Sequence, residues 1–245
     1  MTAKNAVIHR VATLDLKVEP WTWPFAAQRR DAIDAHFAEK QREKPALWNG
    51  RILLGRDARF AGGHLGAHYF ETDFAGLLAW RDWGYPDTTI FNGFGMGALR
   101  SVDGAFVLGV MGNHTANAGR IYFPAGTPDP DDVSDGLLDV GASVAREVEE
   151  ETGLAPGDYR PRTHWDCVVT ATSIAMMQIL DVDASGDELK RRIEANLARQ
   201  EEAELSAIRL VRNRAELTSA MPLFVTAFLE AQFDGEVQVR QDGSQ

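Results

Sequence analysis

The spacing of apolar residues in the first third of the chain predicts strands and helices in alternation. Residues 6–18 alternate between apolar and polar positions, as a half-buried strand does. Good helix formers fill residues 26–44, and residues 71–84 have the spacing of a helix that ends at a glycine. Between these helices, the Asn49-Gly50 pair predicts a hairpin turn. We therefore expect an α/β unit in this part.

The same alternation continues toward the middle of the chain. Strands are expected on both sides of the Asp103-Gly104 turn, and a short strand within residues 119–126. Proline and aspartate make residues 127–136 a loop. A helix is predicted over residues 139–152, because its first residue is a good N-cap.

Two core strands, an amphipathic helix, a short strand and an apolar helix complete the pattern. They are expected at residues 163–172, 173–183, 186–200, 207–211 and 221–233. Because strands and helices alternate along the chain, the sequence predicts the α/β class, with helices packed on a sheet.

One glycine-rich stretch is ambiguous. "GFGMGA", residues 93–98, formally satisfies a dinucleotide-binding fingerprint. A functional fingerprint opens a helix after a strand, whereas a turn follows here within a few residues. We therefore predict a flexible loop at this position.

Charge and cysteine content narrow the classes of function. The net charge of -11 argues against binding to nucleic acid or a membrane surface, because both are anionic. Cys167 is the only cysteine, so neither an intrachain disulfide nor a cysteine-based zinc site can form. No stretch has the pattern of a signal peptide or a transmembrane helix, and a cytoplasmic protein is expected.

Four glutamates crowd the end of the helix predicted at residues 139–152. In "REVEEETGL", Glu147 and Glu151 lie four positions apart on one face, where they repel each other, and Glu150 lies beside them. Such a cluster at a helix C-terminus also opposes the helix dipole. A bound cation is the simplest compensation, although most charge runs are simply solvated. Glu149 faces away and is expected to be solvated.

This stretch resembles the second half of the Nudix box residue for residue. That half reads Arg-Glu-aliphatic-any-Glu-Glu-any-Gly-aliphatic, and the upstream "YFPAGTP" is similar to the strand and turn that precede the box. The upstream half departs from the motif, because its glycine and glutamate positions fall on Asp132 and Leu138. The register is recovered if Gly126 is the motif glycine and the loop at 127–138 contains an insertion, with Asp139 near the missing glutamate.

The resemblance implies an α/β/α sandwich with a mixed sheet for residues 86–245. Residues 1–85 would form an N-terminal α/β extension, with a soft boundary. It also implies hydrolysis of a diphosphate linkage in a nucleoside diphosphate derivative, releasing a nucleoside monophosphate. The layout of the first third is weakly similar to that of Nudix proteins acting on UDP-sugars, so a sugar nucleotide is the first choice of substrate. Dinucleotides, coenzyme A-type diphosphates and nucleoside triphosphates stay open.

The resemblance also assigns roles within the acidic helix. Glu147, Glu150 and Glu151 would hold Mg²⁺, with Mn²⁺ as an alternative, and Arg146 would orient them by ion pairing. Gly153 would let the chain leave the helix sharply.

A few residues outside the helix are further candidates. Glu204 is expected as an additional metal ligand or general base, with Glu201 and Glu202 as substitutes, although an exposed charge is the simpler interpretation of each. The loop containing Asn113 and His114, together with Arg120 and Gly126, could contact substrate; an ordinary polar hairpin is the alternative for the loop. The aromatic rings Phe94, Tyr122 and Trp165 could stack on a base, but core packing is the simpler interpretation.

The expected partner is a small nucleotide substrate, with no nucleic acid and no membrane. A homodimer stays open. From a different class of function, a non-catalytic Nudix-fold sensor or binding module is the alternative. Loss of the upstream motif glutamate favours the sensor, and retention of the repelling glutamates opposes it.

Overall fold

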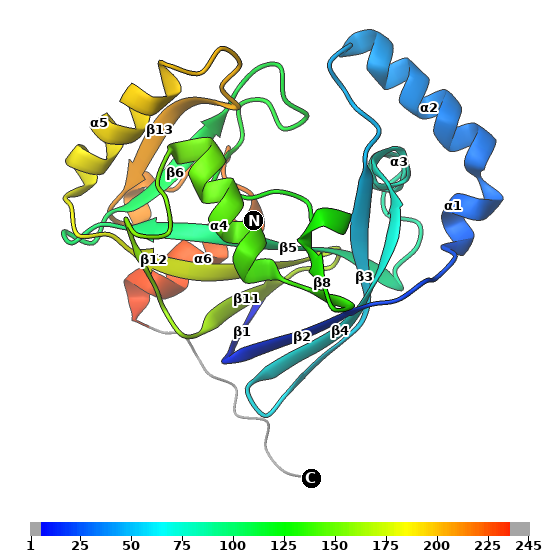
Figure 1. Ribbon diagram of the computed structural model, residues 1–245, viewed down its shortest axis with the longest axis horizontal. Helices are drawn as coiled ribbons and strands as arrows, with labels where there is room; N and C mark the ends of the chain where they lie inside the picture. The colour runs from blue at the N-terminus through cyan, green and yellow to red at the C-terminus, as the bar shows by residue number, and fades with distance from the viewer. Residues whose placement is uncertain (1–5, 236–245) are drawn as a thin grey trace.

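The computed structural model describes residues 6–235, drawn in colour in Figure 1. The α-helices of this range are α1 (Pro24–Gln28), α2 (Arg30–Glu43), α3 (Phe74–Asp82), α4 (Val140–Thr152), α5 (Gly186–Leu197) and α6 (Leu223–Asp234). The strands are β1 (Val7–Val11), β2 (Thr13–Val18), β3 (Arg51–Ala61), β4 (His64–Asp73), β5 (Ile90–Arg100), β6 (Phe106–Met111), β7 (Ile121–Tyr122), β8 (Val133–Ser134), β9 (Leu137–Leu138), β10 (Arg160–Pro161), β11 (Trp165–Val169), β12 (Ser173–Asp181) and β13 (Leu205–Val211). Two short 3₁₀ helices are η1 (Pro130–Asp132) and η2 (Arg214–Glu216). No helix in the described part is long and apolar enough to cross a membrane.

The strands join one mixed sheet with β5 at its centre. Its main path runs β1-β11-β12-β5-β3-β4-β2-β9-β8, and the remaining strands branch from it. β5 pairs in parallel with β12 and antiparallel with β3 and β6. Only Ala12 separates β1 from β2, yet these strands lie far apart in the sheet order, so the sheet curls back on itself. The prediction of one strand over residues 6–18 is therefore wrong.

Helices cover both faces of the sheet around β5, which confirms the α/β/α arrangement. Gly95 faces α4, because an added Cβ there would lie 2.5 Å from Val144 Cγ2 and 2.6 Å from Val140 Cγ1. The neighbouring Phe94 points to the opposite face, where its ring packs against Phe224 of α6 with centroids 5.4 Å apart. On the α4 side, α5 lies beside α4 and against β13 (Figure 1).

The flexible loop predicted at residues 93–98 is wrong, because these residues form the middle of β5. The alternating glycines lie in a buried strand and remove side chains from the face that α4 covers. A Cβ on Gly97 would collide with Val148 of α4. The glycines therefore let the acidic helix approach the sheet closely.

The N-terminal helices cover a second, separate core. It contains only residues between 23 and 90, with Phe70 and Trp80 fully buried at its centre. The hairpin turn predicted at Asn49-Gly50 is wrong; Asn49 instead binds the first turn of α3, since its Oδ1 accepts from the Ala75 N–H at 2.7 Å. The observed hairpin turn lies between β3 and β4.

The division into residues 1–85 and 86–245 stays a prediction. Residues 1–5 and 236–245 of these two parts lie outside the described residues. Within the described range, the second core supports an N-terminal unit, whereas β1 joins the sheet beside β11 of the C-terminal part.

Candidate active site

The acidic helix α4 begins and ends where the sequence predicts. Asp139 is its N-cap, and the Asp139 carboxylate accepts from the Ala142 N–H at 2.9 Å. Gly153 adopts φ 73° at the C-terminus, and its N–H donates to the Glu149 carbonyl at 2.8 Å. A stripe of valines packs α4 against β5, and Glu147 and Glu151 lie on a different face of the helix.

Glu151 is a buried carboxylate with one unpaired oxygen. The residue is only 5% exposed. Its Oε1 accepts a long hydrogen bond of 3.4 Å from the Ala125 N–H, and its Oε2 has no hydrogen-bond partner among residues 6–235. Burial raises the pKa of Glu151 well above its ordinary value, and the negative charges of Glu147 and Glu204 raise it further. A buried and unpaired carboxylate is costly, so this position suits a group that supplies positive charge.

Glu147 lies next to Glu151 and against the backbone of Gly126. A side chain at Gly126 would collide with the Glu147 carboxylate, so glycine is needed for this approach. The Glu147 side chain is 13% exposed, and its Oε1 accepts from Arg146 at 2.8 Å. Burial raises the pKa of Glu147 to about 7, although the charge of Arg146 opposes the shift. Gly126 therefore borders the carboxylate cluster.

Arg146 bridges the cluster to a residue that the sequence did not identify. Its Nη2 donates to Asp132 Oδ1 at 2.9 Å, and the Asp132 side chain is only 4% exposed. The other Asp132 oxygen accepts from the Ser143 hydroxyl at 3.1 Å. Asp139, expected near the missing glutamate, instead caps α4. The sequence offered one signal for Asp132, which stands where the motif has a glycine. Counting along the motif treats an aspartate at that position only as a mismatch.

The remaining candidate carboxylates lie at the edge of the cluster. Glu150 is 62% exposed, and its Oε2 lies 3.7 Å from Arg146. Glu204 is exposed, immediately before β13, and its charge raises the pKa of both Glu147 and Glu151. Glu149 instead raises the pKa of Tyr159, in accord with the expectation that it faces away from the cluster.

The cluster fits the chemistry of a hard divalent cation. In residues 6–235, no three His, Cys, Asp or Glu side chains already stand at the spacing of a metal site. The donor set nevertheless consists of carboxylate oxygens, which Mg²⁺ and Mn²⁺ prefer, and Glu151 Oε2 is buried without a partner. Of the expected metal ligands, Glu147 and Glu151 are the least exposed, and Glu150 is largely exposed.

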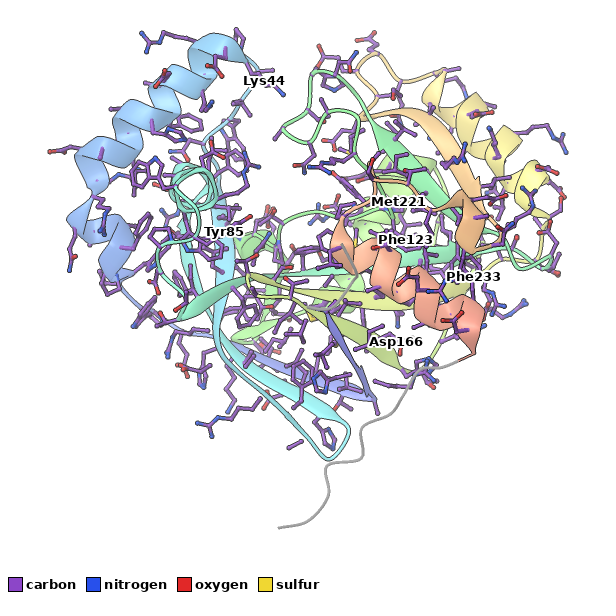
Figure 2. The ribbon with its side chains drawn as sticks, turned by 180° about the vertical axis from the view of Figure 1, so that it is seen from behind. Lys44, Tyr85, Phe123, Asp166, Met221 and Phe233 are labelled. Carbon is purple, nitrogen blue, oxygen red and sulfur yellow. The ribbon has the colours of Figure 1, made fainter. Side chains whose placement is uncertain are left out.

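A cavity of about 700 Å³ adjoins the cluster through Gly126 and Tyr122. Burial raises the pKa of Tyr122 to about 12, and the charges of Glu151 and Glu204 add to this rise. Tyr85, which follows α3, and Met221, which precedes α6, are lining residues seen in Figure 2. The other lining residues are Phe74, Leu77, Leu78, Trp80, Arg81, Asn92, Phe94, Met96, Ala116, Asn117, Arg120, Ala125, Thr127, Thr170, Ala171, Thr172, Ser173, Pro222, Leu223 and Phe224.

The predicted substrate-binding residues are placed unequally around this cavity. Arg120 and Gly126 line it. Asn113 and His114 are exposed residues that do not line it. Phe94 and Tyr122 border the cavity, whereas Trp165 is buried elsewhere, on β11. The N-terminal helix α3, whose part in the site the sequence did not indicate, forms one wall.

Comparison with known proteins gives similarities to solved structures. No protein-family model matches the chain, and no curated protein matches it. A Nudix hydrolase from Nitrosomonas europaea is 18% identical with a TM-score of 0.38, over 59% of this chain and 90% of that chain. A MutT protein from Methanosarcina mazei Go1 is 22% identical with a TM-score of 0.35, over 60% and 96% of the two chains. RenU, a Nudix hydrolase from M. smegmatis, is 14% identical with a TM-score of 0.37, over 57% and 81%. Two of these three structures are named Nudix hydrolases. The function of this chain is inferred from the residues of its site.

Proposed function

We propose that the protein is a Nudix-type hydrolase that depends on a divalent metal. It cleaves a diphosphate linkage in a nucleoside diphosphate derivative and releases a nucleoside monophosphate. The observation that carries this proposal is Glu151, a buried carboxylate with an unpaired oxygen. Besides burial, the charges of Glu147 and Glu204 raise its pKa. A structural role does not need such an arrangement, because it lowers stability unless a cation binds.

The residues of the site have distinct proposed roles. Glu147, Glu151 and, after movement, Glu150 would hold Mg²⁺ or Mn²⁺, which would neutralise negative charge on the phosphoryl oxygens. Arg146 holds the Glu147 carboxylate in place by the 2.8 Å hydrogen bond. Glu204 is the exposed carboxylate next to the cluster and would accept a proton from the attacking water.

The cavity beside the cluster would receive the substrate. Arg120 lines it and has no carboxylate within ion-pair distance in residues 6–235, so its guanidinium is available to a phosphate. A base or sugar can pack against an apolar wall of this cavity, which is formed by Phe74, Phe94 and Phe224. A volume of about 700 Å³ is within the range of small-molecule sites. A sugar nucleotide remains the first choice of substrate.

A non-catalytic sensor is the second candidate. Leu138, buried in β9, occupies the position of the upstream motif glutamate, and this substitution favours the sensor. The crowded glutamates of α4 argue for catalysis, because a sensor would not require them. Small-molecule nucleotide specificity, a cytoplasmic location and an N-terminal extension at residues 1–85 are further parts of the proposal.

Product analysis tests the proposal. The protein is incubated with Mg²⁺ and a panel of sugar nucleotides, dinucleotides, coenzyme A species and triphosphates, and the products are separated and weighed by mass spectrometry. Metal-dependent release of a nucleoside monophosphate from one class is expected, and the product pair identifies the phosphorus that is attacked. Metal binding without turnover on the whole panel would favour the sensor.

A further inference from the structure

A second cavity adjoins the first on the side of the N-terminal helices. Its volume is about 500 Å³, and it shares Leu78, Arg81 and Ala116 with the first cavity. The two cavities therefore lie next to each other. The other residues that line the second cavity are His36, Lys40, Glu43, Lys44, Leu47 and Asp82.

Positive charge gathers around these two cavities, in a chain whose net charge is -11. Among residues 6–235, no aspartate or glutamate lines the first cavity, whereas Arg81 and Arg120 both do. In the second cavity, Lys40 pairs with Glu43 at 3.2 Å, and Arg81 pairs with Asp82 at 3.0 Å. These two carboxylates are thus already engaged.

Lys44 is the cation of the second cavity that lacks a carboxylate. Its Nζ donates to the Thr115 carbonyl at 2.8 Å, across the space between the end of α2 and the loop after β6 (Figure 2). No carboxylate lies within ion-pair distance of Lys44 in the described range. An ammonium group has three donors, so two remain for a ligand.

The groups around the two cavities match an extended substrate. Gly126, which lies against the Glu147 carboxylate, lines the first cavity together with Arg120, and Arg81 lies at the junction because it lines both cavities. A diphosphate held at the cluster therefore has room to extend its attached moiety into the second cavity. Acidic groups in that moiety would be repelled by the cluster and attracted by Lys44 and Arg81.

We propose that the second cavity is a subsite for an additional anionic group, a phosphate monoester or a carboxylate, carried by the substrate beyond its diphosphate. This subsite rests on the proposed hydrolase function. Lys44 is its principal ligand, and Arg81 supports it from the junction. The preferred substrates are thus those in which a nucleoside diphosphate is joined to a moiety that bears a further negative charge.

Substrate pairs that differ by one anionic group test the subsite. The pairs are UDP-glucuronate with UDP-glucose for a carboxylate, and NADPH with NADH for a phosphate, which NADPH carries on the adenosine that the diphosphate joins to the nicotinamide nucleoside. In the class that is hydrolysed, kcat/KM is expected to be about tenfold higher for the more anionic member, the size of one charge-assisted hydrogen bond. Lys44→Met is expected to remove this preference by lowering kcat/KM for the more anionic member. Lys44→Arg should keep it.

A different result is expected if Lys44 only anchors the loop after β6 through its hydrogen bond to Thr115. In that case Lys44→Met lowers kcat/KM equally for both members of a pair, and the subsite is overturned. Lys190→Met is the matched control, because Lys190 lies on α5 and pairs with Glu194 at 3.7 Å. It should change neither value.

Binding without metal separates this inference from the hydrolase proposal. Calorimetry in excess chelator measures the affinity of each pair for the wild type and for Lys44→Met. Stronger binding of the more anionic member, lost in Lys44→Met, supports the subsite even if no compound is turned over, a result that would count against the hydrolase alone. Equal binding of both members, or binding of neither, overturns the subsite.

Discussion

The buried carboxylates should make the metal-free protein less stable as the pH rises, and Glu147→Gln tests this. Burial raises the pKa of Glu147 from 4.5 to about 7, against the opposing charge of Arg146. Between these pH values, the folded protein retains a proton that the unfolded chain has released. The folded state is therefore favoured at low pH, and stability is lost as the pH rises through this range. Glu151, whose pKa is also raised, contributes with the same sign.

The size of the effect follows from the shift. A change in pKa from 4.5 to about 7 corresponds to about 3 kcal/mol of unfolding free energy above pH 7. Glutamine carries no charge at this position, so the variant avoids that loss. Metal-free Glu147→Gln is expected to be more stable than the wild type by about 3 kcal/mol at pH 8, and by under about 1 kcal/mol at pH 5.

Urea unfolding in the presence of chelator measures both differences, with tryptophan fluorescence as the signal. Glu149→Gln is the control, because Glu149 is an exposed neighbour on the same helix and should change stability little at either pH. A Glu147→Gln variant that is less stable than the wild type at pH 8, or a difference that is independent of pH, would refute the reasoning. Glu147 would then be a solvated carboxylate in solution.

Three further predictions concern the same site. Glu151→Gln should abolish turnover and the stabilisation of the protein by Mg²⁺ at pH 8, with an unchanged circular dichroism spectrum; full activity would remove Glu151 from the site. Gly95→Ala should lower stability by about 1–3 kcal/mol, because its Cβ would overlap the valines of α4; thermal unfolding measures this against Gly66→Ala, whose Cβ would lie 4.0 Å from its nearest neighbour. Asp132→Ala should lower kcat by about tenfold or more, since Arg146 loses the partner that orients it; equal kcat values for this variant and for Asp131→Ala, at an exposed neighbour, would contradict that role.

The acidic helix could be predicted from the sequence because its signals are local. The N-cap Asp139, the valine stripe and the terminal Gly153 all lie within one short segment, and each acts on the backbone nearby. The crowding of Glu147 and Glu151 likewise follows from helical spacing alone. Their burial does not, because it depends on Ala125 and Gly126, which reach the cluster from the preceding segment.

The errors occurred where a residue serves a distant part of the chain. Asn49-Gly50 has the composition of a hairpin turn, but Asn49 is used to cap α3, more than twenty residues later. The glycines of residues 93–98 have the composition of a loop, but they make room on β5 for a helix that begins at residue 140. In both cases local propensity permits several structures, and a tertiary contact selects one of them.

The loop at 127–138 shows why counting along a motif misses part of the site. Arg146 needs a carboxylate on the side away from Glu147 if it is to hold that residue rigidly. The motif position that normally carries an acid is Leu138, which is buried in β9 and cannot serve. The loop instead folds through the 3₁₀ helix η1, where the Asp129 N–H donates to Asp132 Oδ2 at 3.2 Å and orients that carboxylate toward Arg146. An acid thus reaches Arg146 from the loop, at a position that counting along the motif assigns to a glycine.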